Sequence, residues 1–311
     1  MPLDELDLML MKELEINARQ GAHVIAKKLG ANRTTVDNRL KRLIEKGVVK
    51  IRTITNRESL GYKLLYVIRI NARPGKSAAV ADQLVPIQPI KYVALTTGRF
   101  DILTWALFRD SSELMRFLSE DLGNIPDVAD IETIISFQPV KNTWRYFTPQ
   151  PDTTELVTDE ATMNDFSELD LVIIKEMELA PRQTMTDLAR KVGSNRVAVT
   201  RRFQELLGGG IMKFVSVVDP KALEYTVETV LLVTVKPDKI QVVATELAHF
   251  SRLKHISLIT GDSQIYISAS FKDIPELHDF LSNTLSRIPE VLRYENLHVV
   301  KELKYSITVL T

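Results

Sequence analysis

The chain has 311 residues, of which 45% are hydrophobic and 26% are charged. This is the composition of a globular protein, so it argues against wholesale disorder, and the length indicates two domains or more. The 40 Lys and Arg balance the 40 Asp and Glu, which argues against a uniformly basic surface but leaves room for a local basic patch. The absence of cysteine excludes disulfides, thiolate catalysis and cysteine-ligated metals. No apolar run approaches the ~20 residues of a membrane helix, so we expect a cytoplasmic protein that does not contact membranes.

Residues 4–46 predict three helices. Asn32 is placed to cap the third helix and Gly47 to end it, and 48–55 is rich in β-branched residues, which favours a strand. The apolar positions that recur at helical spacing are Leu6, Leu10, Leu14, Ile25, Leu29, Val36, Leu40 and Leu43.

Residues 64–141 have a different character and predict the order βαββαβ, a two-layer ferredoxin-like module. The short segment 97–101 contains a glycine and connects two strands as a hairpin. The predicted strands are 64–72, 92–97, 102–108 and 129–140, and the predicted helices are 77–84 and 112–122.

The chain repeats itself at an offset of 163 residues without a gap. Arg19-Gln20 recurs as Arg182-Gln183, and Tyr62 recurs as Tyr225. The whole unit is therefore written twice, separated by a polar, Pro-containing linker. We expect domains at 1–55, 56–147, 164–218 and 219–311, with the linker at 148–163.

A helix-turn-helix needs a small residue where its helices cross, a glycine in the turn and an apolar residue that locks the second helix. Ala26, Gly30 and Val36 have this spacing, and the second copy repeats it.

Residues 1–52 carry 11 Lys and Arg against 7 Asp and Glu, a net charge of +4. We therefore favour binding of double-stranded DNA over the alternative of a solvated three-helix bundle. The candidate DNA contacts are Arg33, Thr34, Thr35, Asn38, Arg39, Lys41 and Arg42, and either Arg39 or Arg42 could instead contact phosphate or pair within the protein.

The second copy predicts weaker or different DNA binding. Residues 164–215 have a net charge of only +1, and Lys41-Arg42 is replaced by Gln204-Glu205. Its candidate contacts are Arg196, Arg201 and Arg202. Gly208 to Gly210 follow the helix, and they are no phosphate loop because the Lys-Ser/Thr of that motif is absent.

These motifs resemble the Lrp/AsnC family of feast/famine transcription regulators. The resemblance rests on Ala26 with Gly30, Gly47-Val-Val, Leu60-Gly-Tyr62, Thr97-Gly-Arg-Phe-Asp101 and Ile125-Pro-x-Val128, and it recurs in the second copy. It implies an α+β chain in which a winged helix-turn-helix and a βαββαβ effector domain occur twice. The resemblance also implies a difference, because most family members carry one such module and act as dimers or higher assemblies. A tandem fusion could therefore reproduce the dimer within one chain, read an asymmetric DNA site and form a homo-oligomer of fused chains.

The resemblance also places an effector site at the hairpin of each βαββαβ domain. A glycine, a guanidinium and a carboxylate suit an amino-acid zwitterion, although Gly98 and Asp101 could equally serve the turn itself. In the second copy Asp262 replaces Arg99, so a second identical pocket is not expected. The candidate effector contacts are Thr97, Gly98, Arg99, Asp101, Thr260, Gly261, Asp262 and Gln264.

The sequence is also compatible with two rival functions. Siroheme decarboxylases resemble the family and work as two unlike subunits, so a fused pair is a model for such an enzyme, although 91–97 lacks the His- and Arg-rich character expected of one. A ligand-sensing scaffold without DNA binding is the other alternative. No histidine recurs between the copies and no catalytic motif stands out, so we expect no enzyme, no cofactor and no metal site.

Overall fold

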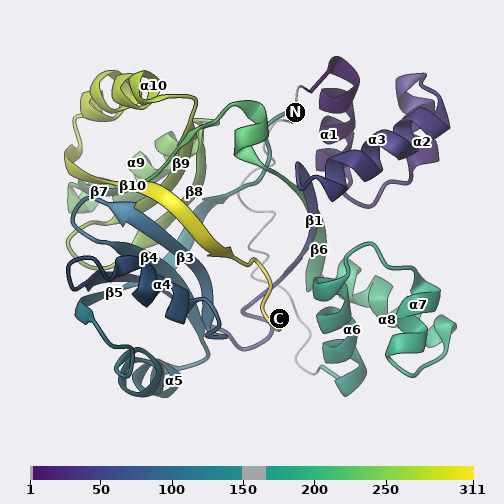
Figure 1. The fold of residues 1–311 in the computed structure, drawn as a ribbon, viewed down its shortest axis with the longest axis horizontal. Coiled ribbons are helices and arrows are strands. Elements are labelled where there is room, and N and C mark those ends of the chain that lie inside the picture. Colours follow the sequence, from purple (N-terminus) through teal and green to yellow (C-terminus); the bar gives the residue numbers. More distant parts are fainter. Residues whose placement is uncertain (1–2, 149–165) are drawn as a thin grey trace. The chain divides into compact units, whose positions relative to one another are not determined.

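The structure is a computed structural model that describes residues 3–148 and 166–311. Its contacts divide the chain into two compact units, each assembled from both copies of the repeat (Figure 1). Unit 1 takes the described residues of 1–60, 144–223 and 307–311, and unit 2 takes 61–143 and 224–306. The predicted linker at 148–163 falls, except for Thr148, outside the described residues.

Unit 1 holds both helix-turn-helix segments. In each, three helices pack around a small apolar core, which includes Leu10, Ile25 and Leu40 in the first copy and Ile173, Leu188 and Phe203 in the second. The elements of unit 1 are α1 (Glu5–Ile16), α2 (Ala22–Leu29), α3 (Arg33–Glu45), β1 (Val49–Thr55), α6 (Glu168–Leu179), α7 (Met185–Lys191), α8 (Arg196–Gly208), β6 (Met212–Val218) and a 3₁₀ turn at Pro220–Leu223.

The strand predicted after the third helix pairs with its counterpart in the other copy. β1 and β6 form an antiparallel two-stranded ribbon, with Val49 opposite Val218 and Thr55 opposite Met212. The wing strand of each copy is thus completed by the other copy and not by a hairpin of its own.

The chain that follows each effector domain returns to the first helix of the same copy. Glu15 is buried in α1 and accepts hydrogen bonds from the backbone N–H groups of Tyr146, Phe147 and Thr148 at 2.6 to 3.0 Å. In the second copy Glu178 accepts from the N–H groups of 309 and 310, both at 2.9 Å. A carboxylate that accepts several N–H donors holds these backbone segments against the helix.

Unit 2 holds both βαββαβ modules, in the predicted order of elements. The helix predicted at 112–122 is α-helical only at Ser111–Arg116 and continues as a π-helical turn at Phe117–Leu122. The strands Leu64–Ala72 and Ile102–Phe108 and the helix Ser77–Leu84 have the predicted ends. The elements of the first module are β2 (Leu64–Ala72), α4 (Ser77–Leu84), β3 (Ile90–Thr97), β4 (Ile102–Phe108), α5 (Ser111–Arg116), a π-helical turn (Phe117–Leu122) and β5 (Val128–Asn142). Those of the second are β7 (Val227–Val235), a 3₁₀ turn (Pro237–Lys239), α9 (Ile240–Ala248), β8 (Leu253–Ile259), β9 (Ile265–Phe271), α10 (Ile274–Asp279), a π-helical turn (Phe280–Thr284), a 3₁₀ turn (Leu285–Arg287) and β10 (Val291–Tyr305).

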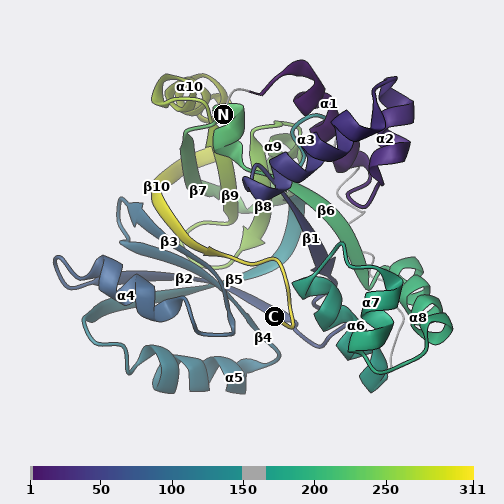
Figure 2. The same ribbon diagram turned by 45° about the vertical axis from the view of Figure 1, so that its right-hand side comes forward.

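The eight strands of unit 2 close into one barrel, in the order β10-β3-β4-β2-β5-β8-β9-β7. Pairing of β5 with β8 and of β10 with β3 joins the two modules, so the barrel needs both copies. The strands of each module form one half, or sheet, of the barrel. Helices α4 and α5 cover the outer face of the sheet of the first module, and α9 and α10 cover that of the second module (Figure 2).

Side chains alternate between the two faces of each strand, as the period of two requires. On β2, Ile68 and Ile70 pack beneath the helices, whereas Val67 lies in the core between the two sheets. Leu232 and Leu297 from the second copy belong to the same inner core. This shared core buries apolar surface that each module alone would expose to water.

Candidate nucleic-acid interface

The third helix of the first copy is built as the sequence predicts. Asn32 caps α3 by accepting hydrogen bonds from the N–H groups of Thr34 at 2.8 Å and Thr35 at 3.4 Å. Val36 and Leu43 are fully buried. These contacts fix one face of α3 against α1 and α2 and leave the other face to solvent.

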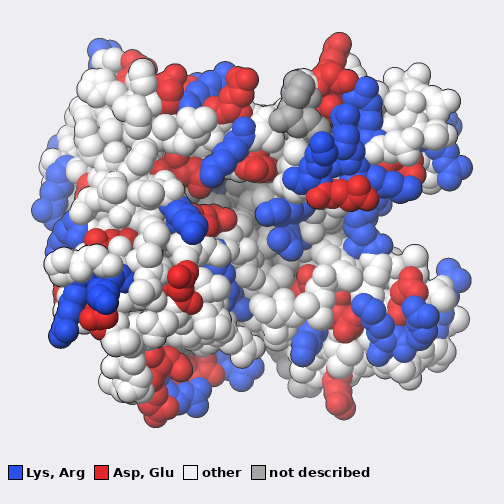
Figure 3. All heavy atoms as spheres, in the orientation of Figure 1, with Lys and Arg blue, Asp and Glu red and all other residues white. Residues whose placement is uncertain are grey.

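The solvent face of α3 gathers the residues predicted to contact DNA. Arg33, Thr34, Thr35, Asn38 and Lys41 are all exposed. Lys41 forms an ion pair with Asp37 one turn earlier, at 2.8 Å. Figure 3 shows Lys and Arg side chains gathered over this helix-turn-helix. The face therefore offers guanidinium, amide, hydroxyl and ammonium donors in one row, which is what a major groove and its phosphates require.

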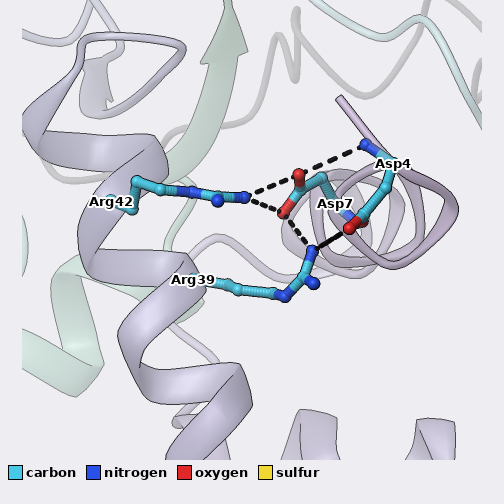
Figure 4. Close-up of polar contacts among 4 residues, drawn as sticks. All are labelled: Asp4, Asp7, Arg39 and Arg42. Carbon is cyan, nitrogen blue, oxygen red and sulfur yellow. Dashed lines mark hydrogen bonds and ion pairs between the residues drawn. The ribbon is translucent and has the colours of Figure 1, made fainter. Parts of the chain in front are cut away.

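Arg39 and Arg42 are half-buried and tie α3 to the start of α1 (Figure 4). Arg39 donates to Asp4 at 2.5 Å and to Asp7 at 3.1 Å, and Arg42 donates to both oxygens of Asp7 at 2.7 and 2.8 Å. The hydrogen bond from Arg39 lowers the pKa of Asp4 below its ordinary value. Both residues thus form internal pairs, and contact of either with DNA stays a prediction.

In the second copy the arrangement is sparser. Arg196 and Arg201 are exposed on α8, and Arg201 lies 3.7 Å from Glu205. Arg202 donates to the fully buried Asp170 at 2.8 and 2.5 Å, which repeats the pairing of Arg39 with Asp7. The hydrogen bond to Asp170 raises the pKa of Arg202 above its ordinary value.

Sequence reasoning missed the contacts that join the two helix-turn-helix segments. Arg19 donates to the backbone carbonyl of Gln183 at 3.1 Å, and its guanidinium lies 4.7 Å from the ring centroid of Phe214. Thr53 donates to the carbonyl of Met177 at 2.5 Å. The recurrence of Arg19-Gln20 as Arg182-Gln183 was the signal that could have drawn attention to Arg19. These contacts make both copies parts of one compact unit.

The hairpin of the first effector module is held by its own residues. Gly98 has a φ of +124°, and a Cβ there would approach the carbonyl oxygen of Asn296 to 3.2 Å, so the position favours glycine. Asp101 accepts a hydrogen bond from the N–H of Ala72 at 2.9 Å. Arg99 is half-exposed and pairs with Glu132 at 2.6 Å.

In the second hairpin a glutamine takes the place of the aspartate that accepts a backbone hydrogen bond in the first. Gln264 accepts from the N–H of Val235 at 3.1 Å, and both residues stand 163 positions after Asp101 and Ala72. Asp101 and Gln264 therefore share a structural role at the end of a strand. Thr260 donates its N–H to the carbonyl of Ile135 at 3.0 Å, whereas Thr97, Gly261 and Asp262 are exposed.

The two hairpins meet an ionic cluster on the inner face of the barrel. Arg69 is 4% exposed and contacts Glu132, and its guanidinium lies 3.9 Å from Glu295. Glu132 and Glu295 occupy the same position in the two copies. Arg99 completes the cluster at 3.7 Å from Asp262, so an arginine of the first hairpin faces an acid of the second.

Comparison with known proteins matches both units. The Lrp/AsnC ligand binding domain matches residues 65–145 and again 228–309, and the AsnC-type helix-turn-helix domain matches 3–44. The chain belongs to the Lrp/AsnC family. The HTH-type transcriptional regulator FL11 of Pyrococcus abyssi is 37% identical over 142 residues, which are 45% of this chain and 93% of that protein. The HTH-type transcriptional regulator Ptr1 of Methanocaldococcus jannaschii is 28% identical over 45% of this chain and 95% of that protein.

Each of these single-module relatives corresponds to about half of this Lrp/AsnC chain, in agreement with the two-module arrangement. The siroheme decarboxylase NirDL, solved in complex with an iron-uroporphyrin III analogue, has a similar fold over 99% of this chain and 95% of its own, with a TM-score of 0.67 and 17% identity. Within 3–148 and 166–311, no helix is long and apolar enough to cross a membrane, and no His, Asp and Glu cluster could hold a metal ion.

Proposed function

We propose that this Lrp/AsnC protein is a transcription regulator that binds double-stranded DNA sequence-specifically through α3, with α8 as a second and weaker contact. The observation that carries the proposal is the exposed row of Arg33, Thr34, Thr35, Asn38 and Lys41 opposite the buried face of α3. Phosphate contacts by Arg33 and Lys41 would position the helix, and Asn38 is suited to reading adenine.

The proposal is tested by titrating the purified chain onto labelled genomic fragments, including the region upstream of its own gene, at several salt concentrations. We expect tight binding to a few fragments and a steep loss of affinity with salt, since each neutralised phosphate adds about −0.9 to the slope of log K against log salt. Arg33→Ala with Lys41→Ala should weaken binding and flatten that slope. Lys12→Ala is the matched control, because Lys12 is exposed on α1 outside this row. Equal, weak binding to all fragments, unchanged by the double variant, would contradict the proposal.

We further propose that the hairpins sense a small zwitterion such as an amino acid. The first hairpin, with Thr97, Gly98, Arg99 and Asp101, connects β3 to β4, and the second, with Thr260, Gly261, Asp262 and Gln264, connects β8 to β9. The two hairpins approach each other where Arg99 lies 3.7 Å from Asp262. Arg99 could exchange its partner Glu132 for a ligand carboxylate. Calorimetric titration with the twenty amino acids tests this, and binding that persists unchanged in Arg99→Ala would contradict the role of Arg99.

We also propose that fused chains associate into dimers or higher assemblies, as the family relationship suggests. Sedimentation analysis over a range of protein concentrations measures this directly, and a chain that remains monomeric throughout would overturn it.

A siroheme decarboxylase activity is a second candidate, favoured by the likeness to NirDL across nearly the whole chain. The purified chain incubated with siroheme and then desalted should retain a porphyrin absorbance band if this candidate is correct. Absence of the band, together with selective DNA binding, would reject it.

A further inference from the structure

One apolar side chain of the second recognition helix is almost fully exposed. Val197 is the second residue of α8, and its exposed fraction is 80%. Two residues later Val199 is fully buried, and Phe203 one turn further on is 4% exposed, so these side chains and not Val197 fix the helix to its core. The side chain of Val197 is therefore available for contact with something outside the chain.

The first copy presents hydroxyl groups at the same place. Val197 and Ala198 stand 163 positions after Thr34 and Thr35. Valine has nearly the shape of threonine, but a methyl group replaces the hydroxyl, so it cannot donate or accept a hydrogen bond. The second recognition helix has thus lost two hydrogen-bonding groups at its start and kept apolar surface there.

An apolar side chain recognises one feature on the base edges of the major groove, the C5-methyl group of thymine. Two neighbours of Val197 on α8, one residue before it and four residues after it, bring cationic charge beside it. Arg196 and Arg201 are both exposed, and guanidinium groups at this position favour contact with phosphates.

We propose that Val197 recognises a thymine methyl group in the half-site bound by the second copy. This inference rests on the proposed DNA binding and adds the base feature that distinguishes the two halves of the site. The first copy reads its half-site through the hydroxyls and amide of α3, and the second reads a methyl group.

The half-site of the second copy is located first. Because the chain has no cysteine, Gln204→Cys supplies a unique attachment point for an iron chelate, and Gln204 is exposed on α8. Hydroxyl-radical cleavage of a bound fragment then marks the base pairs beside α8.

Each thymine in that half-site is next replaced by deoxyuracil, which lacks only the methyl group, and Kd is measured for the wild type, Val197→Ala and the matched control Thr34→Ala. We expect one replacement to weaken the wild type and Thr34→Ala about fourfold, the effect of one methyl-sized apolar contact, and to leave Val197→Ala unchanged. Equal responses of the wild type and Val197→Ala at every thymine would overturn the inference while DNA binding stands. A change of oligomeric state in Val197→Ala would also overturn it, since Val197 would then contact protein. If no fragment binds selectively, the proposed function itself fails, and this inference fails with it.

Discussion

Arg52 lies directly opposite Val215 in the β1–β6 ribbon, and Val215 stands 163 positions after Arg52. When a two-fold axis relates two antiparallel strands, the residue next to the axis pairs with its own counterpart in the other strand. The barrel has the same two-fold symmetry, because Ser136 pairs with Ile259, the counterpart of Thr96, and Thr96 pairs with Val299, the counterpart of Ser136. Each unit of this chain therefore has the internal pairing that two identical subunits would have.

The two recognition helices should contribute unequally to DNA binding. We expect Asn38→Ala with Lys41→Ala to weaken binding more than Arg196→Ala with Arg201→Ala, because α3 presents the fuller row of donors. Arg202 is left intact in this comparison, since it pairs with the buried Asp170 and its loss would disturb folding. Filter binding or fluorescence anisotropy measures the two effects, and equal losses would show that both helices bind DNA alike.

Asp170 should make the stability of unit 1 sensitive to acid. Burial alone raises the pKa of Asp170, but hydrogen bonds from Arg202 and Ser167 outweigh burial and hold the pKa below its ordinary value. A carboxyl with a lowered pKa stabilises the fold above its unfolded pKa of about 4, and this contribution is lost as the pH falls below that value.

Asp170→Asn should therefore lower the free energy of unfolding at pH 7 by about 3 kcal/mol and remove this part of the acid dependence. Asp187→Asn is the control, because Asp187 is exposed on α7. Urea unfolding followed at pH 7, 5 and 3 gives the comparison. A variant that keeps the wild-type slope with pH would show that Asp170 is not responsible.

Arg69→Leu should destabilise unit 2, although Leu232 is the natural residue at the same position of the second copy. The substitution removes the buried cation that lies beside Glu132 and Glu295, whose side chains are 29% and 28% exposed. We expect a loss of about 2 kcal/mol, less than for a fully buried carboxylate because solvent still reaches both groups. Arg73→Leu, which removes an exposed arginine 3.8 Å from Asp127, should cost well under 1 kcal/mol. Equal thermal shifts for the two variants would contradict the role given to Arg69.

Glu178→Gln should loosen the last residues of the chain. Glutamine keeps the size of the side chain but loses the charge and one acceptor oxygen, so the N–H groups of Val309 and Leu310 lose part of their bonding. We expect their hydrogen exchange to accelerate about tenfold while exchange at 146–148 stays unchanged, and Glu15→Gln should produce the reverse. Acceleration of both segments in both variants would point to general destabilisation.

Helix caps, helical periodicity and helix ends could be predicted from sequence, and contacts between elements distant in the chain could not. Asn32, Val36 and Gly47 specify a helix by local rules of capping, periodicity and termination, so α3 appears where it was expected. The contact of Arg69 with Glu295 joins residues of different copies, and a repeat at constant offset does not reveal how its copies pair.

The same limit applies to the candidate site. The exposed face of α3 followed from its helical period, whereas the ion pairs of Arg39 and Arg42 depend on where α1 lies. The sequence does carry one sign of these internal pairs. Asp7 and Glu15 recur as Asp170 and Glu178, and all four lie within otherwise apolar helix faces. Charged residues repeated at buried positions predict internal partners, and all four have them.

The closed barrel of unit 2 draws its strands from both halves of a single chain. In a protein that builds such a barrel from two separate subunits, dilution separates the halves and the apparent stability falls with concentration. Here closure of the barrel is a unimolecular event, so a single chain can complete the barrel at any protein concentration. A cell could therefore keep very few molecules of this protein without losing its folded form.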